Sequence, residues 1–135
     1  MSAPRGRDRP LLVVADDEQD LLELVRMRLG QGGYEVITAS DGKRCLELIL
    51  EKLPDLVVLD VRMPHLDGYE VTRRIRARPE TAGIPVLLLS ASVRPEEVER
   101  GFEAGANDYL RKPFEASELS ERVTALLDRG APATG

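Results

Sequence analysis

Acidic, hydroxyl and ammonium side chains stand at the ends of four of the five short apolar runs in this sequence. They are Asp16 and Asp17 after the first run, Asp60 after the third, Ser90 after the fourth and Lys112 after the fifth. Carboxylates gathered in one pocket repel one another, so they need a counter-charge. Oxygen donors without His or Cys select a hard cation, Mg²⁺ or alternatively Mn²⁺. Such a set suits phosphoryl transfer, in which positioning and charge neutralisation dominate.

Asp60 is the candidate nucleophile, because it stands alone while Asp16 and Asp17 look like a paired metal site. A carboxylate that attacks a phosphoryl group forms an acyl phosphate. Lys112 supplies a positive charge for a phosphoryl oxygen or for the bare carboxylate, and Ser90 supplies a hydrogen-bond donor. Each residue also has an ordinary structural interpretation, as a helix cap, a surface lysine or a strand end. Their convergence on one edge of a sheet favours the chemical interpretation.

The elements that would position these residues alternate regularly along the chain. Strands are expected at residues 11–15, 34–39, 55–59, 86–89 and 107–110, each followed by a helical pattern. Strict alternation predicts a parallel sheet with helices on both faces and right-handed crossovers. We therefore expect an α/β, flavodoxin-like, doubly wound fold with strand order 2-1-3-4-5, and a site beyond the carboxyl ends of the strands.

Some side chains are assigned to the core or to the surface from the same pattern. Val98, Phe102 and Ala106 are the expected inner residues of the fourth helical segment. Cys45 lies on the apolar side of the second helix, where a small buried residue is expected. His65, the only histidine, is expected to be exposed in the loop that follows Asp60.

Composition narrows the class of protein. The 135 residues suit one domain, expected at residues 10–129 between a disordered segment, 1–9, and a tail or linker, 130–135. The net charge of −5 argues against a nucleic-acid-binding body. With one cysteine and neither a signal peptide nor a membrane span visible, we expect a cytoplasmic protein without a membrane partner.

Four segments together resemble one known family. They are Asp16-Asp17, the segment 58–68 (VLDVRMPHLDG), Ser90-Ala91 and the segment 109–114 (YLRKPF). In order and spacing they resemble the receiver domain of two-component response regulators, and the resemblance covers about residues 10–128.

The resemblance implies a role for each acidic residue. Asp60 would accept a phosphoryl group from a histidine kinase or a histidine phosphotransfer protein. Asp17 and Asp60 would bind Mg²⁺ directly and Asp16 through water, with the backbone carbonyl of Arg62 completing the protein ligands.

The resemblance also implies a switch. Lys112 would contact the phosphoryl group, and its peptide bond to Pro113 would be cis. Ser90 would turn toward the phosphoryl group, and the ring of Tyr109 would move inward with it. The output protein is unknown.

Three positions depart from the commonest family pattern: Ser90 stands where Thr is frequent, Arg62 is large and cationic, and Ser117 replaces a basic residue often used for dimerisation.

Three functions are compatible with these residues to different degrees. The chain is a stand-alone receiver, or the regulatory piece of a longer protein such as a transcription factor, a diguanylate cyclase or a hybrid kinase, or a haloacid-dehalogenase-like phosphatase. The phosphatase needs an acid two residues after its nucleophile, where this chain has Arg62. We expect no enzyme activity beyond the domain's own phosphorylation and dephosphorylation.

Overall fold

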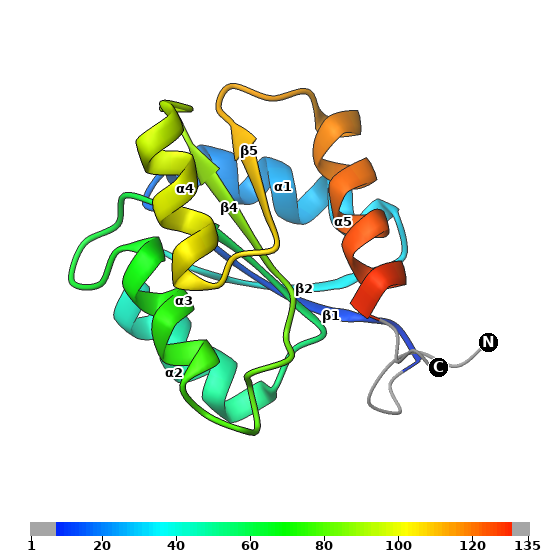
Figure 1. Cartoon of the computed structure of the whole chain (residues 1–135). Helices are drawn as coiled ribbons and strands as arrows, with labels where there is room; N and C mark the ends of the chain where they lie inside the picture. Colours follow the sequence, from blue (N-terminus) through cyan, green and yellow to red (C-terminus); the bar gives the residue numbers. More distant parts are fainter. Residues whose placement is uncertain (1–7, 131–135) are drawn as a thin grey trace.

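Five strands and five helices alternate in the structure, a computed structural model that describes residues 8–130. The strands are β1 (Leu11–Ala15), β2 (Glu35–Ala39), β3 (Leu56–Asp60), β4 (Val86–Ser90) and β5 (Asp108–Arg111). The helices are α1 (Gln19–Gln31), α2 (Gly42–Lys52), α3 (Gly68–Arg76), α4 (Pro95–Ala104) and α5 (Ala116–Gly130). All strand pairs are parallel, in the order β2-β1-β3-β4-β5 (Figure 1). The expected doubly wound fold and strand order are confirmed.

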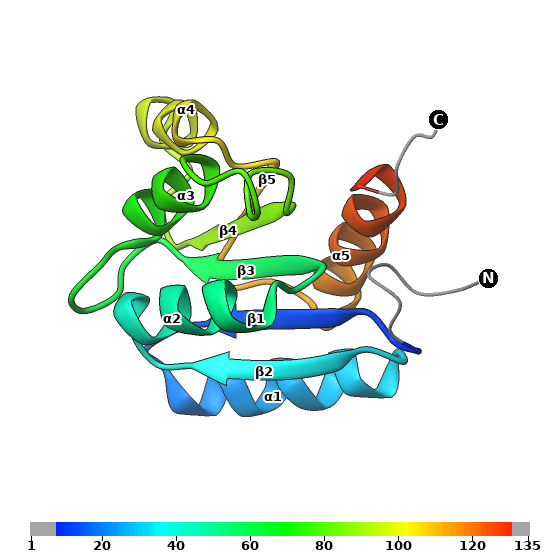
Figure 2. The same cartoon turned by 90° about the horizontal axis from the view of Figure 1, so that it is seen from below.

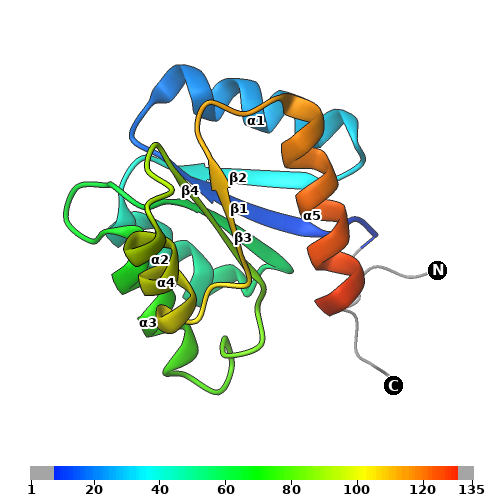
Figure 3. The same ribbon diagram turned by 45° about the horizontal axis from the view of Figure 1, so that its top comes forward.

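Two apolar cores lie on opposite faces of the sheet, because successive side chains of a strand point to opposite faces. On one face, Val13, Val57 and Leu88 pack in the same cluster as residues of α2, α3 and α4. On the other face, Leu12 and Val58 pack with residues of α1 and α5. Figures 2 and 3 show the sheet between these two helical layers. Strands β1, β3 and β4 are buried along their whole length, which explains their unbroken apolar sequences.

Short polar residues begin two of the helices that flank the site. The Asp41 side chain accepts a hydrogen bond from the Arg44 amide at the start of α2, at 2.8 Å. The Asp67 side chain does the same for the Glu70 amide at the start of α3, also at 2.8 Å. These caps satisfy amides that have no partner within the helix, and they set where each helix begins after its loop.

The expected inner face of α4 is wrong in part. Phe102 is 45% exposed, and the residues of α4 that are buried are Gly101 and Ala104. A Cβ on Gly101 would lie 2.9 Å from a Leu88 methyl group, so small residues let this helix pack directly against the sheet. The apolar pattern of the sequence predicts burial of the bulky residues of α4, whereas the small residues are the ones that contact the sheet. Ala106 is buried, but it follows the end of α4.

The structure also decides several smaller expectations from the sequence. Cys45 is fully buried and His65 is exposed, as expected. Asp60 and Ser90 are the last residues of their strands instead of following them. The expected terminal segments fall largely on residues 1–7 and 131–135, outside the described residues. Within residues 8–130, every helix is too short or too polar to cross a membrane.

Candidate functional site

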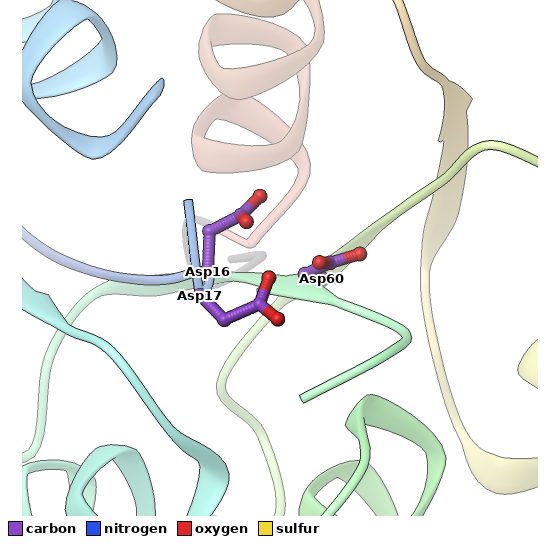
Figure 4. Close-up of side chains that lie close together, drawn as sticks. All are labelled: Asp16, Asp17 and Asp60. Atoms are coloured by element: carbon purple, nitrogen blue, oxygen red, sulfur yellow. The ribbon is translucent and has the colours of Figure 1, made fainter. Parts of the chain in front are cut away.

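Three aspartates converge at the carboxyl ends of β1 and β3. Each of Asp16, Asp17 and Asp60 offers a carboxylate oxygen, and these oxygens all lie within 4.8 Å of one another (Figure 4). The parallel register sets this arrangement, because Ala15 pairs with Leu59 and an aspartate directly follows each of these two residues. Asp16 and Asp60 are buried, whereas Asp17 is exposed.

Lys112 supplies the positive charge from the loop after β5. Its ammonium nitrogen lies 2.9 Å from Asp16 Oδ2, 3.1 Å from Glu18 Oε1 and 3.4 Å from Asp60 Oδ2. The Lys112 amide donates to the Ser90 carbonyl at 2.8 Å, so the side chain starts beside the end of β4. The prediction that Lys112 reaches the acidic cluster is confirmed, and its peptide bond to the next residue is cis as expected.

Glu18 is a member of the site that sequence reasoning did not assign. It follows Asp16-Asp17 directly, so a third consecutive acid was the available signal. Its amide donates to Asp16 Oδ1 at 3.0 Å, and its carboxylate shares the Lys112 ammonium. Because its side chain is 65% exposed, its ion pair is weaker than those of the two buried aspartates.

Ser90 of β4 and Tyr109 of β5 are linked through Ser92. The Ser90 hydroxyl is buried at the end of β4 and accepts a hydrogen bond from the Ser92 amide at 3.1 Å. The Tyr109 hydroxyl donates to the Ser92 carbonyl at 3.1 Å and lies 3.5 Å from the hydroxyl of Tyr69. The Tyr109 ring is therefore already inside the protein in this structure, with Ser92 joining it to Ser90.

The loop after β3 brings backbone groups to Asp60. The Arg62 amide donates to Asp60 Oδ1 at 3.4 Å, while the Arg62 side chain is exposed. Gly68 packs so closely that a Cβ there would lie 2.6 Å from the Asp60 carbonyl oxygen. Glycine at the start of α3 is therefore a steric requirement of the site.

Burial and like charge change the protonation of this cluster. Burial, followed by the charge of Asp16, raises the pKa of Asp60 from 3.8 to about 6, although Lys112 and the Arg62 amide act in the opposite direction. Burial alone would lower the pKa of Lys112, but hydrogen bonds and charge from Asp16, Asp60 and Glu18 raise it above its usual value. Lys112 therefore stays protonated at neutral pH and offsets only part of the negative charge.

The cluster has the donor chemistry of a hard-cation site. Its ligand atoms are three carboxylate oxygens, and the single ammonium leaves a negative excess. A polar hollow of about 450 Å³ opens beside Asp17, between the loop after β3 and α4, and Arg62, Tyr69 and Arg100 contribute to its wall. A separate, mainly apolar groove of about 380 Å³ lies beside Lys112, between α1 and α5.

Comparisons with known proteins agree with this geometry. The family model of the response regulator receiver domain matches residues 12–124. The phosphate regulon transcriptional regulatory protein PhoB of Rhizobium meliloti is 42% identical over 123 residues, which are 91% of this chain and 54% of that protein. The chain spans about half the length of the curated relatives that it matches.

Solved structures show the same likeness. A putative response regulator from Chloroflexus aurantiacus has a TM-score of 0.85 and 41% identity, covering 90% of this chain and 99% of that one. The receiver domain of the sensor histidine kinase PA1611 from Pseudomonas aeruginosa, which has a magnesium ion coordinated in its active-site cleft, has a TM-score of 0.82 and 29% identity, covering 89% and 98%. The chain described here belongs to the receiver domain family of two-component response regulators.

Proposed function

We propose that Asp60 is the phosphoryl acceptor of this receiver domain and that a phosphohistidine of a histidine kinase or a histidine phosphotransfer protein is the donor. The observation that carries the proposal is the position of the Lys112 ammonium, 3.4 Å from Asp60 and within a cluster of three carboxylates. In the reaction an Asp60 oxygen forms a bond to phosphorus while the bond from phosphorus to the histidine nitrogen breaks. That nitrogen keeps the electron pair.

The residues around Asp60 have distinct parts in this proposal. Mg²⁺, or Mn²⁺ in its place, would be held by Asp16, Asp17, Asp60 and the backbone carbonyl of Arg62, and when bound it neutralises phosphoryl charge. Lys112 would exchange a carboxylate partner for a phosphoryl oxygen. Its contact with two buried aspartates keeps it protonated and ready for this exchange.

Phosphorylation would shift the domain between two arrangements. A phosphoryl group replaces one negative charge with roughly two and adds acceptor oxygens. Ser90 would turn its hydroxyl toward these oxygens and give up the Ser92 amide, and the segment that leads into α4 would move with it. The face formed by α4, β5 and α5 would carry the signal to an output protein that is still unknown.

The experiment is phosphorylation with acetyl phosphate and Mg²⁺, followed by intact mass. The native chain should gain one phosphoryl group, and Asp60→Asn should gain none. Asp128→Asn, which changes an exposed aspartate of α5, is the matched control and should be modified like the native chain. Modification of Asp60→Asn to the native extent would overturn the assignment of Asp60. Unchanged labelling of the native chain in excess EDTA would overturn the need for a metal ion.

The relatives favour a regulatory unit of a longer protein over a stand-alone receiver. The matched relatives are about twice as long as this chain, and one is described as a transcriptional regulatory protein. In such a protein we expect the acidic receiver to contact no nucleic acid itself and to act on a separate output domain. A reading frame that continues beyond Gly135 into a second domain would support this, and a stop codon there would support the stand-alone receiver.

A further inference from the structure

Tyr69 joins α3 to the segment around Ser90 and Tyr109. Its side chain lies at the start of α3 and is 3% exposed. Its hydroxyl donates to the Glu97 carbonyl in α4 at 3.2 Å and lies 3.5 Å from the Tyr109 hydroxyl. The Arg100 guanidinium lies 4.4 Å from the centre of the Tyr69 ring, so α4 also holds the ring from one face.

The hydrogens available to these two phenols limit what they can bind. Each hydroxyl has one hydrogen: Tyr69 gives its own to Glu97, while Tyr109 can share its hydrogen between the Ser92 carbonyl at 3.1 Å and the more distant Tyr69 oxygen at 3.5 Å. The Tyr69 oxygen keeps free lone-pair capacity and lies beside the Tyr109 hydroxyl. It is therefore a ready substitute acceptor if the Ser92 carbonyl moves away.

The position of Ser92 depends on the contacts of Ser90, since the Ser92 amide donates to the Ser90 hydroxyl. A turn of Ser90 toward a phosphoryl group would break that bond and release the Ser92 carbonyl from its present place. A buried phenol hydroxyl without an acceptor raises the free energy of the buried arrangement, which favours rotation of the ring toward solvent. The Tyr69 oxygen removes this penalty, so the Tyr109 ring can stay buried while the segment before α4 moves.

The space for the inward ring comes from α4. A Cβ on Gly101 would lie 3.1 Å from two carbon atoms of the Tyr109 ring, closer than most Cβ contacts allow. A glycine in the middle of a helix is unfavourable, so its presence needs a local reason. Here the reason is that the ring occupies the volume that a larger side chain would fill.

We propose that Tyr69 is a positioning residue that holds the Tyr109 ring inward before phosphorylation and keeps its hydroxyl paired when Ser90 turns. This inference rests on the proposed switch at Ser90 and Tyr109. It implies that the ring does not have to enter the protein on phosphorylation, since it is already there. Loss of the Tyr69 hydroxyl should then favour an outward ring and disfavour the phosphorylated arrangement.

The direct test measures the Tyr109 ring in the absence of any phosphodonor. Tyrosine ring signals are recorded by NMR on ¹³C-labelled protein with a soluble paramagnetic agent, whose effect increases with exposure. In Tyr69→Phe the relaxation of the Tyr109 signal by the agent should rise at least about twofold, because one hydrogen-bond partner is lost. The matched control is Tyr34→Phe, which removes a hydroxyl that lies 3.1 Å from Thr124 Oγ1, and it should leave Tyr109 unchanged.

A second measurement tests the coupling to the site. With Mg²⁺ and beryllofluoride as the probe, Tyr69→Phe should bind about fivefold more weakly than the native chain. In a Tyr109→Phe background the same substitution should have almost no effect, since its partner hydroxyl is gone. An equal loss in both backgrounds would overturn the positioning role, as would an unchanged Tyr109 signal in Tyr69→Phe.

The two measurements separate this inference from the proposed function. If the native chain failed to bind beryllofluoride, the phosphoryl site would be wrong, while the ring measurement would still decide the role of Tyr69. Gly101→Ala provides a variant that leaves both hydroxyls in place. Its methyl group should press on the ring and raise the exposure of Tyr109, and an unmoved ring would contradict the packing argument.

Discussion

The charge of Asp60 should destabilise the metal-free protein. The rise of its pKa from 3.8 to about 6, caused first by burial and then by Asp16, means that the folded state binds more protons than the unfolded state across this range. Stability should therefore fall as pH rises from about 4 to about 6. The pKa difference corresponds to about 3 kcal/mol at pH 8 and to about half of that at pH 5.

Removing the charge should recover this free energy. We expect Asp60→Asn to raise the free energy of unfolding at pH 8 by about 2 to 3 kcal/mol in EDTA, and by about half as much at pH 5. Urea denaturation at both pH values measures the difference between the variant and the native chain. Saturating Mg²⁺ should reverse the order, because it stabilises the native chain by binding only its folded state.

A matched control separates the site from general effects of charge. Asp128→Asn removes the same charge from an exposed position on α5, so its effect should stay within about 0.5 kcal/mol at both pH values. If Asp60→Asn were no more stable than the native chain at pH 8 in EDTA, burial would not be opposing the Asp60 charge. A gain of equal size at pH 5 and pH 8 would show that ionisation is not its cause.

Three further substitutions test other contacts. Arg62→Ala should change the dephosphorylation rate of phosphorylated Asp60 at least about twofold, since an exposed cation beside the site contributes up to about 1 kcal/mol, and an unchanged rate would refute this. Arg76→Lys should lower the free energy of unfolding, measured in urea, by about 2 kcal/mol. The half-buried guanidinium donates to four acceptors in two loops, and one ammonium cannot reach them all. A loss below about 0.5 kcal/mol would contradict this explanation. Gly68→Ala should cost about 1 to 3 kcal/mol in urea and weaken Mg²⁺ binding in a titration, whereas Gly30→Ala, whose Cβ would meet nothing within 4 Å, should not.

The parts of this protein that the sequence predicts well are those set by long-range regularity. Five alternating apolar runs determine the doubly wound sheet, and the rule that strand ends share one edge brings together Asp16, Asp17, Asp60 and Lys112. Neither step needs side-chain detail. Burial of whole strands leaves an unbroken apolar sequence, so even the central position of β3 can be predicted.

The sequence predicts poorly those parts of the protein that depend on close packing between helices and strands. Size and helical spacing predict that Phe102 lies in the core, but α4 buries Gly101 and Ala104 instead. Tyr69 has no sequence signal for its hydroxyl partners, which come from α4 and β5. Arg76 looks like one more cation in an arginine-rich helix, yet it spans two loops at the opposite end of the sheet. Such contacts arise only once the helices are docked.

The rigidity of the core keeps the two buried carboxylates of the acidic site close together. Asp16 and Asp60 directly follow paired residues of two fully buried parallel strands, so their separation is fixed by the register of β1 and β3. A shift by one residue would turn every apolar side chain of a strand to the wrong face, which is far costlier than the repulsion of two carboxylates. The strands therefore cannot move apart to relieve the repulsion. It can be relieved by a proton, by the Lys112 ammonium or by a metal ion, and Lys112 is already shared among three carboxylates. The apolar sequence of the two strands is thus as much a cause of the concentrated negative charge as the aspartates at their ends.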